Sequence, residues 1–179
     1  MIKSLDINIK MKTQTIKSKQ EIREPFPDLY IIDTNGNEKT ARAIIESLKQ
    51  KKYQGETALQ GGDDSFNRRV LETLKINYLI SPEKFTDKDT LKQRDSGLNH
   101  VLGKIAKQNN IAIVIDFNDI SGIKDRKGKA VRIAKVIQNV KICRKAGCKI
   151  LIWGNDDKYA LQSFGFSIGM SSQQVGESI

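Results

Sequence analysis

The 179 residues have the apolar content of a soluble globular protein, 38%, but an unusual charge: 31 Lys and Arg against 21 Asp and Glu give a net charge of +10. No apolar run approaches the ~18 residues of a membrane span, and the first residues lack the apolar core of a signal peptide, so we expect a cytoplasmic protein without a membrane partner. Two cysteines are too few for a disulfide framework or a four-ligand zinc site, and we expect both to be small core residues. The positive charge favours a polyanionic partner.

The N-terminal part of the chain carries weak structural signals. Residues 5–11 alternate apolar and polar side chains, which predicts a strand with one wet face. Residues 12–27 are polar without a helical or strand period, which predicts a long loop or a disordered arm. We therefore expect an N-terminal strand and polar arm over residues 1–28 and one domain over residues 29–179.

From residue 29 onward, short apolar runs alternate with stretches of helical periodicity. The runs predict strands at Leu29–Ile32, Thr57–Leu59, Tyr78–Ile80, Ile111–Ile115 and Ile150–Trp153. Runs without polar alternation are typical of strands that are covered on both faces. The alternation of strands and helices predicts an α/β fold with a parallel sheet. Periodicity alone leaves open whether the sheet is doubly wound or closes into a barrel.

The helices of this pattern have recognisable ends. We expect Asn37 to cap the helix that follows the first of these strands, and Ser96 to cap the helix before the run at Ile111–Ile115. A long basic helix precedes the last strand, and Gly147 is expected to end it. These signals fix the order of the elements but not their packing.

Carboxylates recur where the predicted strands end, at Asp33, Asp63, Asp64, Asp116, Asp156 and Asp157. In a parallel α/β fold these positions share one rim, where a metal-dependent phosphoesterase would hold its ions. The alternative is that each aspartate caps the next helix and interacts with its dipole. The chain has a single histidine, and it does not follow a strand, which favours capping. We assign no catalytic residue, no metal ligand and no cofactor bound by the protein.

The strongest signal is a cluster of positive charge. Residues 123–149 hold ten Lys and Arg and only one acid, Asp125, so repulsion on the long helix is left uncompensated unless a polyanion binds. His100, Lys104 and Lys107 share the outer face of the preceding helix, where they are either solvated or contact RNA. Aromatic residues are scarce, which favours recognition of backbone and shape over bases. The residues that we expect to contact RNA are Arg68, Arg94, His100, Lys104, Lys107, Lys129, Arg132, Lys135, Lys141, Arg144 and Lys145.

Four segments carry a family resemblance. They are LISP at Leu79–Pro82, DSGLNHVLGKIAKQNNIAI at Asp95–Ile113, RIAKVIQNVKICRKAG at Arg132–Gly147 and FGFSIGMSSQQV at Phe164–Val175. With this spacing the chain resembles archaeal ribonuclease P protein component 3. The resemblance extends from about Gly62 to the end, and the first sixty residues match only in the order of their elements.

The resemblance implies a TIM-barrel-like fold related to the PHP phosphoesterases but without their metal-binding histidines, complete or left open at its N-terminal end. It implies assembly with ribonuclease P RNA, precursor tRNA and protein component 2, in an enzyme whose RNA removes the 5′ leader with Mg²⁺. It also implies RNA contacts at Arg94, His100, Lys141 and Lys145, with Arg68 a weaker match. A metal-dependent phosphoesterase and a general RNA chaperone remain the alternative functions.

Overall fold

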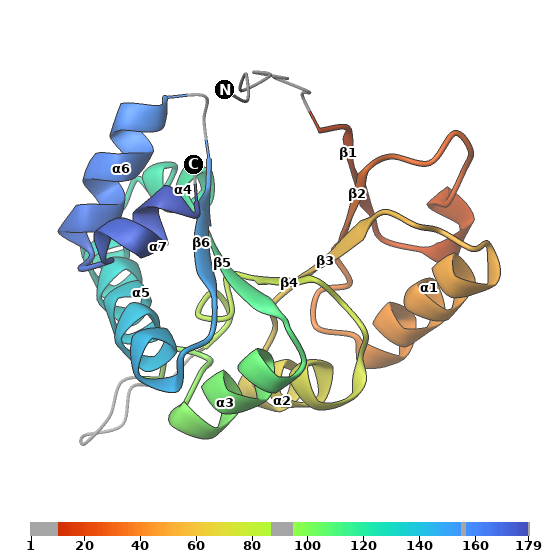
Figure 1. Ribbon diagram of the computed structural model, residues 1–179, viewed down its shortest axis with the longest axis horizontal. Helices are drawn as coiled ribbons and strands as arrows, with labels where there is room; N and C mark the ends of the chain where they lie inside the picture. Colours follow the sequence, from red (N-terminus) through yellow and green to blue (C-terminus); the bar gives the residue numbers. More distant parts are fainter. Residues whose placement is uncertain (1–10, 87–94, 155–156, 179) are drawn as a thin grey trace, which may run out of the picture.

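The computed structural model describes residues 11–86, 95–154 and 157–178. Within these residues the chain forms one parallel sheet of six strands, which lie side by side in the order in which they occur along the chain (Figure 1). The strands are β1 (Thr13–Ile16), β2 (Leu29–Ile32), β3 (Glu56–Gln60), β4 (Tyr78–Ile80), β5 (Ala112–Asp116) and β6 (Ile150–Trp153).

Helices follow the strands and pack along the outer side of the curved sheet, as Figure 1 shows. Because each crossover moves one position in the same direction, the layout is that of a TIM-barrel-like α/β fold, as predicted. Among the described strands β1 and β6 do not pair, so this part of the barrel stays open. The helices are α1 (Glu38–Gln50), α2 (Asp64–Thr73), α3 (His100–Gln108), α4 (Phe117–Ser121), α5 (Arg126–Ala146), α6 (Lys158–Ser167) and α7 (Ser172–Gly176), with a 3₁₀ turn at Lys19–Glu21.

The two faces of the sheet have different cores. Side chains such as Tyr30, Leu79 and Ile113 point toward the helices and belong to the main core. Their neighbours on the other face, among them Ala58 and Val114, form a second cluster inside the curve of the sheet. Both faces exclude water, which explains why these strands have unbroken apolar runs.

Strand β1 was not predicted. Its residues pair in parallel with β2, with Thr13 opposite Leu29 and Ile16 opposite Ile32, so a loop or a disordered arm was the wrong expectation for this stretch. Only Ile16 is buried, because β1 lies at the edge of the sheet, and a polar edge strand lacks the apolar pattern on which the prediction depended. The strand expected over residues 5–11 lies outside the described residues except for its last residue, which precedes β1.

Two predicted helix ends are confirmed and one is wrong. The side chain of Asn37 accepts a hydrogen bond from the Thr40 amide at 3.0 Å, and Gly147 ends α5 with a positive φ of 74°. Helix α3 is capped by Asn99 and not by Ser96, which is buried. The reason is Gly97, whose φ of 70° turns the chain away from a right-handed helix two residues before the cap.

Candidate nucleic-acid interface

Helices α3 and α5 cross at very close range. A Cβ atom on Gly103 of α3 would stand 2.9 Å from the Cβ of Ala146 and 3.3 Å from Cγ2 of Ile142, both on α5. A side chain at position 103 would therefore push the helices apart. Glycine at this position brings the outer faces of the two helices next to each other.

Four lysines flank this crossing, and we call them the α3/α5 basic surface: Lys104, Lys107, Lys141 and Lys145. All four are exposed. Nζ of Lys107 lies 2.9 Å from the point where a Cβ on Gly147 would stand, so the end of α3 reaches the end of α5. Within the described part of the chain none of the four has an acidic partner within ion-pair distance. His100 is exposed at the start of α3.

Arg132 and Lys135 were expected to contact RNA, which requires exposed side chains, but both side chains are buried. Arg132 is only 8% exposed, and its Nε donates to Oε1 of Glu83 at 2.9 Å while its Nη2 donates to Oδ2 of Asp119 at 3.1 Å. Lys135 is 7% exposed and its Nζ donates to the carbonyl of Thr86 at 2.6 Å. Both residues therefore attach α5 to the loop after β4, and neither is placed to contact RNA.

Glu83 is the centre of this buried polar network. It is 1% exposed and also accepts a hydrogen bond from Nδ2 of Asn139, which in turn donates to the carbonyl of Ser96 at 2.9 Å. Burial raises the pKa of Glu83, and the guanidinium of Arg132 opposes that shift. The acid that balances Arg132 is 49 residues away in the chain, so charge counting within one segment could not find it.

The other predicted RNA contacts have different surroundings. Arg68 is exposed and pairs with Glu72 one turn along α2, at 2.9 Å. Lys129 donates to the carbonyl of Ser121 at 2.8 Å, and Arg144 is exposed but donates to the carbonyl of Gly169. Arg94 lies outside the described residues. Of the predicted RNA contacts in the described residues, the exposed lysines of α3 and of the C-terminal half of α5 lie on the two helices that cross at Gly103.

Capping was predicted for six aspartates that follow strands, and it is confirmed for three of them, Asp63, Asp116 and Asp157. It is wrong for Asp33, because Asn37 caps α1, and for Asp64, which is the first residue of α2, while Asp156 lies outside the described residues. Oδ1 of Asp63 accepts from the Phe66 amide at 2.7 Å, which lowers the pKa of this carboxyl. Oδ1 of Asp116 and of Asp157 each accept at 3.0 Å from the amide three residues later. Within residues 11–86, 95–154 and 157–178 no group of three His, Cys, Asp or Glu side chains is arranged to hold a metal ion.

The role of Asn67 was not predicted. This side chain is fully buried, and its Oδ1 accepts from the Gly62 amide at 2.9 Å while its Nδ2 donates to the carbonyl of Pro82 at 3.0 Å. It therefore joins the loop after β3 to the loop after β4. An asparagine on a helix has no periodic signature, so only the coordinates identify this contact.

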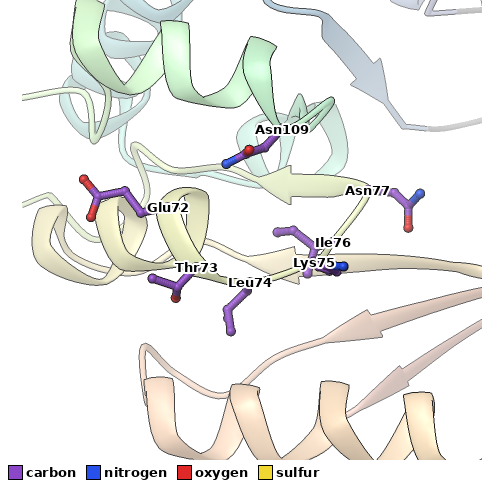
Figure 2. A pocket seen from close by; sticks show the side chains of 7 residues that line it. All are labelled: Glu72, Thr73, Leu74, Lys75, Ile76, Asn77 and Asn109. Atoms are coloured by element: carbon purple, nitrogen blue, oxygen red, sulfur yellow. The ribbon is translucent and has the colours of Figure 1, made fainter.

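A depression of about 470 Å³ lies between the carboxyl ends of α2 and α3, at the amino ends of the strands. This is the end of the sheet opposite to the capping aspartates. Figure 2 shows Glu72 and Thr73 at the end of α2, with Asn109 on the far side of the depression. Nδ2 of Asn109 donates to the carbonyl of Leu71 at 2.7 Å, which joins the two helices. Catalytic residues of βα barrels lie at the carboxyl ends of the strands, so this depression at the amino ends is no candidate active site.

No protein-family model matches the chain. Curated relatives do: ribonuclease P protein component 3 of Methanococcus maripaludis strain C7 is 31% identical over 120 residues, which cover 64% of this chain and 48% of the relative. The same component of Methanococcoides burtonii is 36% identical over 109 residues, covering 60% of this chain and 39% of the relative. The chain is a homologue of archaeal ribonuclease P protein component 3. It spans about half or less of the length of these two relatives.

A longer match to component 3 and two solved structures extend the comparison. Component 3 of Methanocaldococcus jannaschii is 25% identical over 186 residues, covering 89% of this chain and 77% of the relative. A chain in a cryo-EM structure of archaeal ribonuclease P with mature tRNA matches with a TM-score of 0.64 and 22% identity, over 83% of this chain and 64% of that chain. A crystal structure of an uncharacterized protein matches with a TM-score of 0.52 and 12% identity, over 79% of this chain and 38% of that one. These structures share the fold.

No helix in the described part of the chain is long and apolar enough to cross a membrane.

Proposed function

We propose that this chain is an RNA-binding subunit of ribonuclease P that supports the catalytic RNA in endonucleolytic removal of 5′ leaders from precursor tRNA. Its homology to component 3 proteins and its fold, which is shared with a chain of archaeal ribonuclease P, support this proposal. The observation that carries it is the α3/α5 basic surface, where two crossing helices present exposed lysines that have no acidic partner among the residues the structure describes.

The lysines act on phosphates. Each ammonium group that meets a phosphate releases condensed counterions, and this supplies sequence-independent affinity. Two helices that cross at close range hold their charges at fixed spacing, which suits a folded RNA backbone more than a flexible strand. Neutralising phosphates in this way lets RNA helices approach one another, so the protein contributes to the shape of the catalytic RNA.

The chemistry belongs to the RNA in this proposal. The aspartates at the carboxyl ends of β3 and β5 are engaged as helix caps, which leaves them poorly placed as metal ligands. Mg²⁺ is expected to serve the RNA. The chain is expected to act in a hetero-oligomer with protein component 2.

Salt dependence of RNA binding tests the proposal. The variant replaces Lys104, Lys107, Lys141 and Lys145 with Gln. A matched control replaces four exposed lysines near β1 and α1, namely Lys17, Lys19, Lys39 and Lys49, with Gln, which removes the same charge far from the α3/α5 crossing (Figure 1).

Binding to ribonuclease P RNA is measured against the logarithm of salt concentration. Each lost phosphate contact reduces the slope by about 0.7 to 0.9, so the first variant should lose up to about 3 in slope while the control keeps most of it. Equal slopes for the two variants would mean that binding depends on net charge and not on this surface. Cleavage of precursor tRNA by the protein without RNA would favour a protein-catalysed phosphoesterase.

A further inference from the structure

The two cysteines of the chain lie against each other at the end of α5. The amides of Gly147 and Cys148 both donate to the carbonyl of Cys143, at 2.7 and 3.1 Å. A helix that ends in this way through a left-handed glycine brings the side chains at these two positions into contact, usually as an apolar pair. Here both side chains are free thiols, and both belong to the main core.

The surroundings distinguish the two thiols. Cys143 is fully buried, while Cys148 is 6% exposed and its Sγ lies 3.8 Å from the point where a Cβ on Gly103 would stand. The neighbouring thiol of Cys143 lowers the pKa of Cys148, and its own amide and the charge of Lys107 add to this effect while burial opposes it. The thiol of Cys148 and burial both raise the pKa of Cys143. The carboxyl end of α5 disfavours a thiolate, and Lys107 is the positive charge that opposes this effect.

We propose that Cys143 and Cys148 are a redox-active dithiol, which hydrogen peroxide converts into an intramolecular disulfide. The thiolate of Cys148 attacks one peroxide oxygen, the O–O bond breaks, and hydroxide leaves, giving a sulfenic acid. The sulfur of Cys143 then attacks the sulfenic sulfur, forming the S–S bond as the S–O bond breaks. The thiol proton of Cys143 goes to the departing hydroxide as water, so both sulfurs are oxidised and one peroxide is reduced.

This dithiol is independent of the proposed RNA-binding role, although it lies at the edge of the α3/α5 basic surface. The oxidant proposed is a small one because Cys148, although the less buried of the two cysteines, is only 6% exposed. The left-handed turn at Gly147 places positions 143 and 148 at the same end of α5, which is the placement that a disulfide within one chain requires.

The test treats the full-length reduced protein with hydrogen peroxide and follows free thiols and intact mass. The expected result is loss of both thiols with loss of two hydrogen atoms per chain, no cross-linked dimer, and full recovery with dithiothreitol. Because the chain has only these two cysteines, any disulfide within one chain joins them. Thiols that stay reduced, sulfinic acid without a disulfide, or dimers linked between chains would each overturn the proposal.

Single variants test the order of attack. In Cys143→Ser, which keeps a hydroxyl group beside Cys148, dimedone should trap a sulfenic acid at Cys148 at least tenfold faster than it labels Cys143 in Cys148→Ser. Equal or reversed rates would overturn the assignment of Cys148 as the attacking thiol. If a variant fails to fold, limiting iodoacetamide on the unaltered protein gives the same comparison, and alkylation should occur first at Cys148.

Discussion

Replacing Arg132 with Met tests the buried network between α5 and the loop after β4. The substitution keeps a long side chain but removes the charge that Glu83, 1% exposed, faces at 2.9 Å. Removing one partner of a buried ion pair costs about 3 to 5 kcal/mol, because the remaining charge stays in a poorly solvated site. The contact of Arg132 with Asp119 adds at most about 1 kcal/mol, since that carboxylate is partly exposed and still pairs with Lys84 at 2.7 Å. We expect a loss of about 4 kcal/mol.

The loss should depend on pH in a defined direction. Burial raises the pKa of Glu83, and without Arg132 no positive charge opposes this shift. A carboxyl whose folded-state pKa lies above its unfolded value contributes stability that is fully present below the unfolded pKa and is lost as the pH rises through the folded value. The deficit of Arg132→Met relative to the unaltered protein should therefore shrink when the pH falls from about 8 to about 5.

Urea unfolding, followed by the fluorescence of the single tryptophan, Trp153, measures the loss of stability and its dependence on pH. Arg68→Met is the matched control, because Arg68 is exposed and its pair with Glu72 should contribute under about 0.5 kcal/mol. A loss for Arg132→Met that equals the control and does not change with pH would refute the argument from the buried charge.

Further substitutions test the helix contacts and the caps by the same unfolding measurement. Gly103→Ala places a Cβ 2.9 Å from that of Ala146, so α3 and α5 must separate, at a cost of about 1 to 3 kcal/mol; an unchanged midpoint would contradict the close crossing. Asn67→Ala leaves buried groups of Gly62 and Pro82 without partners and should cost about 3 kcal/mol, whereas a loss below about 1 kcal/mol would mean that water replaces the side chain. Asn99→Ala removes the cap of α3 and should cost about 1 kcal/mol, with no loss expected if another group caps the helix.

Much of the fold could be predicted because local sequence patterns determine where most strands and helices lie. The strands Leu29–Ile32, Tyr78–Ile80 and Ile150–Trp153 lie at the predicted residues, since a strand covered on both faces has an unbroken apolar run. Strand β1 was missed because an edge strand needs few apolar side chains. Helix α4 was missed because it is a short helix of five residues capped by Asp116.

The site was predictable only in part, for a different reason. The periodicity of α5 assigns Arg132 to a face, but it says nothing of an acid that the fold brings from 49 residues away. The predicted outer-face position of Lys104 and Lys107 agrees with their exposure, because no described segment packs over them. Sequence patterns therefore located the positive charge, while the coordinates decide which cations the protein uses internally.

Reconstitution tests the central claim most directly. Cleavage of precursor tRNA is measured with ribonuclease P RNA and protein component 2, comparing the unaltered chain, the Lys104/Lys107/Lys141/Lys145→Gln variant and the matched lysine control. The account predicts that the unaltered chain and the control stimulate cleavage at moderate salt, that the variant stimulates it far less, and that no cleavage occurs without the RNA. Equal stimulation by all three chains, or cleavage by the protein alone, would contradict it.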